Sequence, residues 1–180
     1  MTPNGILNPT QVSAGADESA KAHAQRTSEL KGLRVGLLDN TKHNALLFLQ
    51  EVGSLLTEEY GAKEVSIVET KQNFSVPVDR DIIDRFKESS DVVVIGIGDC
   101  GSCSAAAVAD GIQFEGGGLP AAVVITDAFD TTGRSMAKIQ GDAEYQWITT
   151  EHPVAPLSED EVKERARQLT PSIVETLTSA

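Results

Sequence analysis

The two cysteines of this 180-residue chain, Cys100 and Cys103, stand in the stretch GIGDCGSC, directly after a run of Val and Ile. The apolar run predicts a strand and the next segment a helix, so Cys100 lies in the turn between them. Backbone N–H groups at a helix start stabilise anions, including a thiolate. In a C-x-x-C pair at such a position, thiol pKa values fall and reactivity rises. We predict that Cys100 is a nucleophile and that Cys103, one helical turn further on, resolves its adduct or forms a disulfide with it.

The residues around the pair allow other interpretations. Asp99 opposes a thiolate, because a neighbouring carboxylate raises a thiol pKa, and we assign it to proton transfer instead. A pair of buried small hydrophobic side chains is the alternative, but it would not need this glycine-rich turn. A structural zinc requires four ligands, and GIGDCG lacks the third glycine of a dinucleotide loop. We therefore expect no metal and no cofactor.

His152, in TTEHPV, is the best acid–base candidate among the three histidines. It follows the last predicted strand, and its alternative role is that of a turn residue before Pro153. His23 is expected to be solvated, and His43 is either a neighbour of a helix cap or a ligand. His152 therefore joins Cys100 in the predicted catalytic set.

Polar residues also follow each predicted strand. In open parallel sheets, ligands bind beyond the carboxyl ends of the strands, so we expect these loops to converge on one edge with the cysteines. Lys42 and the helix start would bind an anionic group of the substrate, which Asp39, Asn40 and Asp99 would orient. The predicted substrate-binding residues are Asp39, Asn40, Lys42, Gly101, Ser102, Thr126 and Phe129.

Strand and helix patterns alternate along the chain. Strands are expected at residues 33–39, 63–70, 91–99, 119–127 and 144–150, and helices at 43–61, 78–90, 102–115, 131–141 and 158–179. This alternation predicts an α/β, three-layer, Rossmann-like or flavodoxin-like domain with a mostly parallel sheet of four to five strands. In the last helix, Ser158 and Glu161 match a capping box, and Pro171 is predicted to kink or interrupt the helix.

The chain is divided into an N-terminal arm over residues 1–31 and a single α/β domain over residues 32–180. The arm is rich in Ala, Ser, Thr and Gly, with a short helix expected over residues 21–30. We expect the arm to pack on the domain or on a neighbouring subunit, and a disordered tail is the alternative.

The net charge of −12, from 27 acidic and 15 basic side chains, argues against nucleic acid and anionic membranes as partners. No apolar run is long enough to cross a bilayer. The first residues lack the basic flank and apolar core of a secretory signal. We therefore expect a cytoplasmic protein, in a compartment where thiols are normally kept reduced.

The segment GDCGSCSAAAVADGIQFEGGGLPAAVVITDAF resembles the UGSC family, which is named for a selenocysteine-Gly-Ser-Cys motif. The likeness extends over most of the chain, through ILNPT, GLRVGLLDNTKHNA and EHP at residues 151–153. In many members cysteine replaces selenocysteine, so Cys100 takes the selenocysteine place and Cys103 the partner place. More distantly, the family is similar to the selenoprotein B subunits of glycine and D-proline reductases. The resemblance implies a redox-active or nucleophilic chalcogen at position 100.

Three functions remain open. The leading one is a thiol-based oxidoreductase or lyase whose Cys100 attacks a small, polar, carboxylate-bearing substrate, with a dithiol as reductant. The reaction would be reductive cleavage, or thiol-dependent elimination or addition. A cofactor-free isomerase or racemase is the second, although both thiols lie on one turn rather than on opposite walls. The third is a redox sensor or a non-catalytic subunit of a larger homo- or hetero-oligomer.

Overall fold

A single parallel sheet organises the computed structural model, which describes residues 23–178. Its strand order is β2-β1-β3-β4-β5, and every neighbouring pair is parallel. This order is that of the flavodoxin-like folds, so the predicted class and the parallel sheet are confirmed. The strands are β1 (Arg34–Asp39), β2 (Glu64–Thr70), β3 (Val92–Gly98), β4 (Ala121–Thr126) and β5 (Ile148–Thr150).

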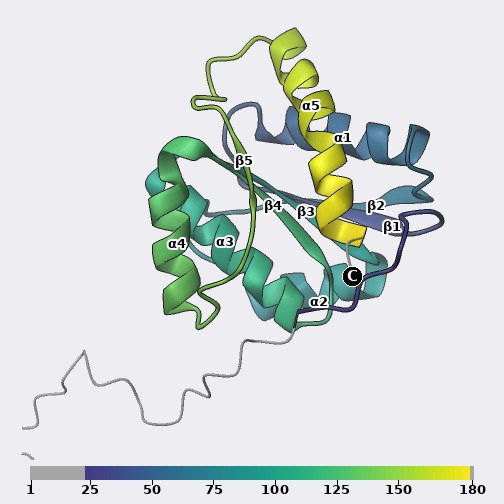
Figure 1. Ribbon diagram of the computed structural model, residues 1–180, viewed down its shortest axis with the longest axis horizontal. Coiled ribbons are helices and arrows are strands. Elements are labelled where there is room, and N and C mark those ends of the chain that lie inside the picture. The colour runs from purple at the N-terminus through teal and green to yellow at the C-terminus, as the bar shows by residue number, and fades with distance from the viewer. Residues whose placement is uncertain (1–22, 179–180) are drawn as a thin grey trace, which may run out of the picture.

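Helices cover both faces of the sheet. On one face lie α1 (Ala45–Glu58) and α5 (Glu159–Thr178) (Figure 1). On the other lie α2 (Arg80–Ser89), α3 (Gly101–Gly116) and α4 (Asp130–Ile139), the last preceded by the short 3-10 turn η1 (Asp127–Phe129). Each face has its own hydrophobic core, so the domain has three layers, as predicted.

Burial distinguishes the central strands from the edge. Every residue of β3 and β4 is buried, which explains their unbroken apolar sequences VVVIGIG and AAVVIT. Strand β2, at the edge, has no fully buried residue. The carboxyl ends of the buried strands therefore open onto one rim, which carries the candidate residues.

Gly98 allows α3 to start directly against the sheet. A Cβ at this position would lie 2.7 Å from Ser104 Cα and 2.8 Å from a methyl carbon of Ile125. Only glycine permits so close an approach of strand and helix. The turn that carries the cysteines is thus packed onto β3 and β4.

The start of α5 is the predicted capping box: the Ser158 N–H and hydroxyl donate to the Glu161 carboxylate, over 2.8 Å and 2.6 Å. The expected interruption at Pro171 is wrong, because α5 is continuous through it. Pro171 and Arg167, four residues earlier, both lie on the exposed side of α5, where a lost backbone hydrogen bond is least costly. Among residues 23–178, no helix has the combination of length and hydropathy that a membrane span requires.

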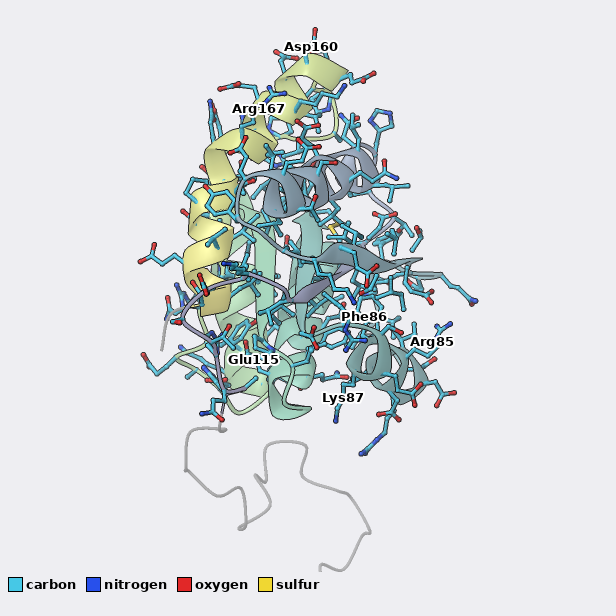
Figure 2. The ribbon with its side chains drawn as sticks, turned by 90° about the vertical axis from the view of Figure 1, so that its right-hand side faces the viewer. Arg85, Phe86, Lys87, Glu115, Asp160 and Arg167 are labelled. Carbon is cyan, nitrogen blue, oxygen red and sulfur yellow. A yellow bond between two sulfur atoms is a disulfide. The ribbon has the colours of Figure 1, made fainter. Side chains whose placement is uncertain are left out.

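The segment before β1 is not helical over residues 23–30, so the short helix expected there is wrong for its described part. Instead the segment is held by side-chain contacts. Ala24 N–H donates to Glu115 over 2.8 Å, and the Arg26 guanidinium lies 2.6 Å from the same carboxylate, labelled in Figure 2. Residues 1–22 of the predicted arm lie outside the described residues, and its boundary at residue 31 stays a prediction.

Candidate thiol site

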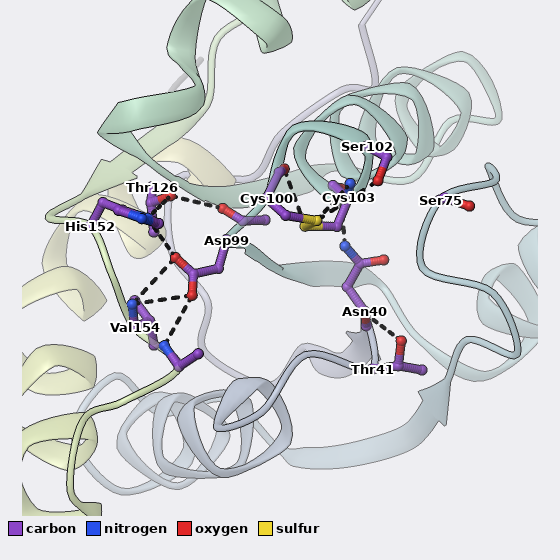
Figure 3. The surroundings of a disulfide bond; sticks show 12 residues. Asn40, Thr41, Ser75, Asp99, Cys100, Ser102, Cys103, Thr126, His152 and Val154 are labelled. Atoms are coloured by element: carbon purple, nitrogen blue, oxygen red, sulfur yellow. Dashed lines mark hydrogen bonds and ion pairs between the residues drawn. A yellow bond between two sulfur atoms is a disulfide. The ribbon is translucent and has the colours of Figure 1, made fainter.

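Cys100 is the N-cap residue of α3, and its sulfur accepts a hydrogen bond from the Cys103 N–H over 3.3 Å. The two sulfur atoms form a disulfide, with the Cα atoms 5.4 Å apart (Figure 3). Cys103 is fully buried, whereas Cys100 is half-buried. A molecule approaching from solvent therefore reaches Cys100 first, and Cys103 lies behind it.

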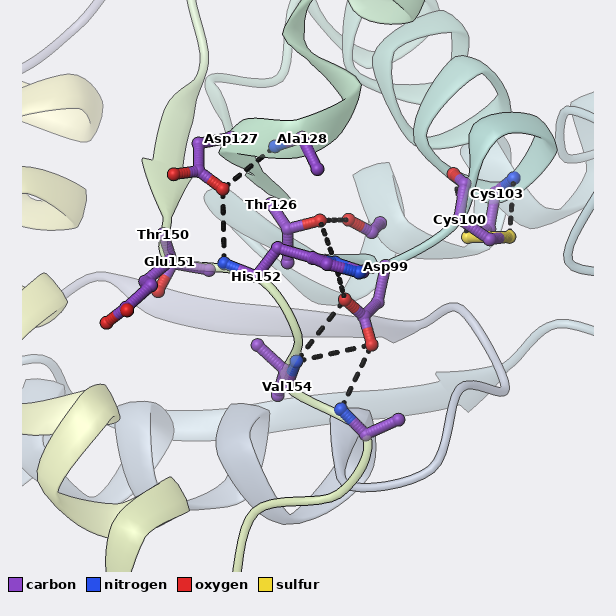
Figure 4. Close-up of polar contacts among 12 residues, drawn as sticks. Asp99, Cys100, Cys103, Thr126, Asp127, Ala128, Thr150, Glu151, His152 and Val154 are labelled. Carbon is purple, nitrogen blue, oxygen red and sulfur yellow. Dashed lines mark hydrogen bonds and ion pairs between the residues drawn. A yellow bond between two sulfur atoms is a disulfide. The ribbon is translucent and has the colours of Figure 1, made fainter.

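Asp99 precedes Cys100 in the chain, but the contacts of its carboxylate are with the loop after β5. Its side chain is 2% exposed and lies 2.8 Å from His152 Nδ1. It also accepts the backbone N–H groups of Val154, over 3.3 Å, and Ala155, over 3.0 Å (Figure 4). Asp99 thus anchors the loop between β5 and α5, which carries His152.

The contacts of His152 assign the proton on its ring. Its Nδ1 lies 3.2 Å from Thr126 Oγ1, whose hydroxyl donates to the Gly98 carbonyl over 3.3 Å. A carboxylate accepts from an N–H group, and the Thr126 hydroxyl proton is already directed at the Gly98 carbonyl, so Nδ1 is assigned as the donor to both. Nε2 has no hydrogen-bond partner within residues 23–178, and the Phe129 ring lies edge-on at 5.4 Å between centroids. In a neutral ring with this tautomer, Nε2 is therefore the nitrogen that can accept a proton.

The loop after β1 lies on the other side of the cysteines. Asn40 is buried, and its side-chain amide donates to the Cys103 carbonyl over 3.0 Å, which braces the first turn of α3. Asp39 is also buried and accepts from Thr70 Oγ1 and from the Thr41 N–H, both over 3.0 Å. Burial raises the pKa of the Asp39 carboxyl above its ordinary value.

The three remaining predicted residues are Lys42, Gly101 and Ser102. Lys42 is half-buried and makes no ion pair with any residue between 23 and 178. A Cβ placed on Gly101 would meet no atom within 4 Å. Ser102 is exposed, and its hydroxyl lies 3.8 Å from Cys100 Sγ. The structure thus brings Asp99, His152, Thr126 and Phe129 together at the strand end that precedes Cys100, and it brings the loop after β1 against α3. Substrate binding by these residues stays a prediction.

Sequence reasoning missed Asn44 and the buried pair Lys71–Asp110. Asn44 donates to carbonyls of the loop after His152. Lys71 Nζ lies 2.5 Å from Asp110, and both side chains are almost fully buried. No local pattern reveals such contacts between distant segments. A hollow of about 430 Å³ lies between the end of β2 and α2, and neither cysteine lines it.

Comparison with known proteins gives a family. No curated protein matches significantly. Among solved structures, the diflavin flavoprotein A3 from Nostoc sp. is 14% identical, with a TM-score of 0.39, and the match covers 81% of this chain and 96% of that chain. The description of the UGSC family matches residues 5–179, almost the whole chain, and the chain therefore belongs to the UGSC family.

Proposed function

We propose that this protein is a thiol-dependent enzyme that acts on a small, polar, carboxylate-bearing substrate through Cys100 and Cys103. The observation that carries the proposal is the asymmetry of the pair. A half-buried sulfur caps a helix at the carboxyl edge of the sheet, and a fully buried partner lies within disulfide reach. An accessible nucleophile backed by a resolving thiol is the arrangement that such chemistry requires.

The proposed reaction is a two-electron reduction. The Cys100 thiolate displaces the α-substituent of the carboxylate, so that an S–C bond forms and the substituent leaves with the electron pair of its bond to carbon. The Cys103 thiolate then attacks Cys100 Sγ, so that the S–S bond forms and the bond to the substrate breaks with its electron pair. The substrate takes up a proton and is reduced, and the disulfide is later reduced by an external dithiol, which is itself oxidised.

The surroundings supply the other functions of the proposal. His152 moves the proton through Nε2, since Nδ1 is engaged by Asp99 and Thr126. Lys42, unpaired among the described residues, and the amides at the start of α3 bind the carboxylate of the substrate. The site lies beside the junction of β1 and β3, the point where strand order reverses and where ligands bind in sheets of this topology.

A redox sensor is the second candidate, and one observation favours it. The two sulfur atoms form a disulfide, which is the oxidised state that a sensor requires. The isomerase hypothesis is less favoured, because the two sulfur atoms form a disulfide instead of facing a substrate from opposite sides.

The test is to trap the adduct. The reduced Cys103→Ser variant is incubated with a panel of small α-substituted carboxylates and examined by intact-protein mass spectrometry. We expect a covalent adduct on Cys100, no adduct in the Cys100→Ser variant, and disulfide formation with loss of substrate in the parent. If hydrogen peroxide forms the disulfide but no carboxylate forms an adduct or is consumed, the sensor replaces the enzyme.

A further inference from the structure

Two side chains hold the loop that carries His152. The N–H groups of Val154 and Ala155 donate to Asp99, over 3.3 Å and 3.0 Å (Figure 4). The carbonyl groups of the same two residues accept from the side-chain amide of Asn44, over 3.1 Å and 3.2 Å. Asp99 and Asn44 therefore satisfy all four backbone polar groups of this dipeptide.

Asn44 is unusual for a residue at the start of a helix. It is the N-cap of α1, where an asparagine side chain ordinarily accepts from the first N–H groups of the helix, yet it makes no such bond. Its backbone is left-handed, with φ of 71°, a conformation that asparagine tolerates better than most residues. The amide also reaches a third carbonyl, that of Leu157, over 2.9 Å. The side chain is thus directed at another loop instead of its own helix.

We propose that Asn44 is a positioning residue for His152, an inference that rests on the proposed role of His152 in proton transfer. Asn44 fixes the carbonyl groups of Val154 and Ala155, which directs their N–H groups at Asp99. The carboxylate is thereby held 2.8 Å from His152 Nδ1. The proton stays on Nδ1, and Nε2 is left to act as a base.

The same residue joins the two halves of the proposed site. Asn44 stands two residues after Lys42, in the loop after β1, and it grips the loop after β5. His43 adds a parallel contact, because its Nδ1 lies 2.8 Å from the Ala155 carbonyl. The group proposed to bind the substrate and the group proposed to move its proton are therefore mounted on connected loops.

We call the hydrogen bonds from Asn44 to the loop after His152 the Asn44 clamp. The tautomer of His152 reports whether this clamp positions the ring. A histidine free in water prefers its proton on Nε2, the reverse of what Asp99 and Thr126 impose here. The Asn44→Gly variant removes the amide, while glycine adopts the same φ without strain. The matched control is Asn73→Gly, which removes an asparagine from the exposed loop after β2, where its side chain hydrogen-bonds to Ser75 alone among residues 23–178.

The experiment is ¹⁵N NMR of the histidine rings at alkaline pH, together with amide exchange. We expect His152 protonated on Nδ1 in the parent and in Asn73→Gly, and a shift toward Nε2 in Asn44→Gly. Exchange at the Val154 and Ala155 amides should rise about tenfold in Asn44→Gly alone.

Two outcomes overturn the proposal. If exchange rises and the tautomer does not change, Asn44 only holds the loop in place. If the parent protein already carries the proton of His152 on Nε2, the clamp does not set the tautomer, and this result needs no variant to fold. Neither readout needs turnover, so a failure of the thiol chemistry is distinguished from a failure of the clamp.

Discussion

The two ends of the sheet each hold one histidine–carboxylate pair of nearly the same geometry. His152 lies 2.8 Å from Asp99 at the carboxyl end, and His23 lies 2.7 Å from Asp142 at the amino end. The histidine side chains are 36% and 40% exposed, and the carboxylates 2% and 3%. Pair geometry therefore does not separate a candidate site from a structural contact.

The two histidine–carboxylate pairs differ in the residues that surround them. At the carboxyl end the pair lies at open strand ends beside Cys100, with Thr126 as a second acceptor for the ring proton. At the amino end, the neighbours are the ion pair Arg26–Glu115 and Tyr145, whose pKa is raised well above its ordinary value by burial. Those neighbours tie the segment before β1 to α3 and offer no nucleophile among the described residues. A histidine pair becomes a candidate site through what lies next to it.

The largest effect on stability is expected at the amino end. In Glu115→Ala, the mostly buried Arg26 guanidinium loses its carboxylate, and the Ala24 and Ala121 amides lose their acceptor. We expect a loss of about 3–5 kcal/mol in the free energy of unfolding, measured in urea. The alkylation rate of reduced Cys100 should stay unchanged under native conditions. Slower alkylation of Cys100 would show that the two ends of the sheet are coupled.

The buried carboxylate of Asp110 extends the contrast, because its partner is a lysine. Burial raises the pKa of Asp110, beside Lys71, from 3.8 to about 6. Since the folded pKa exceeds the unfolded one, the stabilisation from this group is complete below pH of about 4 and is lost as the pH rises through about 6. The free energy of unfolding of the parent, relative to that of Asp110→Asn, should therefore fall by up to about 3 kcal/mol as the pH rises from about 4 to above about 6. If the parent and Asp110→Asn differ in unfolding free energy by the same amount at pH 4 and pH 7, the raised pKa of Asp110 is contradicted.

The third prediction compares the two histidine pairs directly. Asp99→Asn removes the charge that holds His152, and Asp142→Asn makes the same change beside His23. We expect adduct formation on Cys100 to slow about 10²-fold in Asp99→Asn and to stay at the parent rate in Asp142→Asn. Equal rates in the two variants would mean that the pair at the carboxyl end is structural as well.

The smallest effect tests whether position at the carboxyl end is enough for a role in the site. Ser158 caps α5 near this edge: its hydroxyl accepts from the Glu161 N–H over 3.4 Å, and its own N–H donates to the Glu161 carboxylate. Ser158→Ala should cost about 1 kcal/mol of unfolding free energy, measured by thermal denaturation, without changing the alkylation of Cys100. A parallel loss of thiol reactivity would show that the proposed site extends to α5.

The strands and most helices could be predicted from local pattern, because a buried parallel strand must be apolar throughout, as in β3 and β4. The predicted interruption at Pro171 failed because an exposed helix face tolerates a lost hydrogen bond. The fifth strand is shorter than the predicted segment 144–150, since only Ile148–Thr150 pair with β4.

The candidate site was predictable in position but not in its internal contacts. Polar residues at strand ends mark the rim, and this placed Asp99 and His152 there. Sequence does not show that Asp99 and Asn40 are buried, or that Asn44 gives up its cap to grip a loop 110 residues away. Such contacts join segments that are distant in the chain, and no local periodicity reports them.

The most direct test of the central claim is to alkylate the fully reduced protein with iodoacetamide across pH and to measure the rate at each cysteine by mass spectrometry. We predict that Cys100 reacts at least about tenfold faster than Cys103, with half-maximal rate at a pH below about 8.5, the pKa of a free cysteine. Faster reaction at Cys103, or a Cys100 midpoint at or above 8.5, would contradict a thiolate favoured at the start of α3.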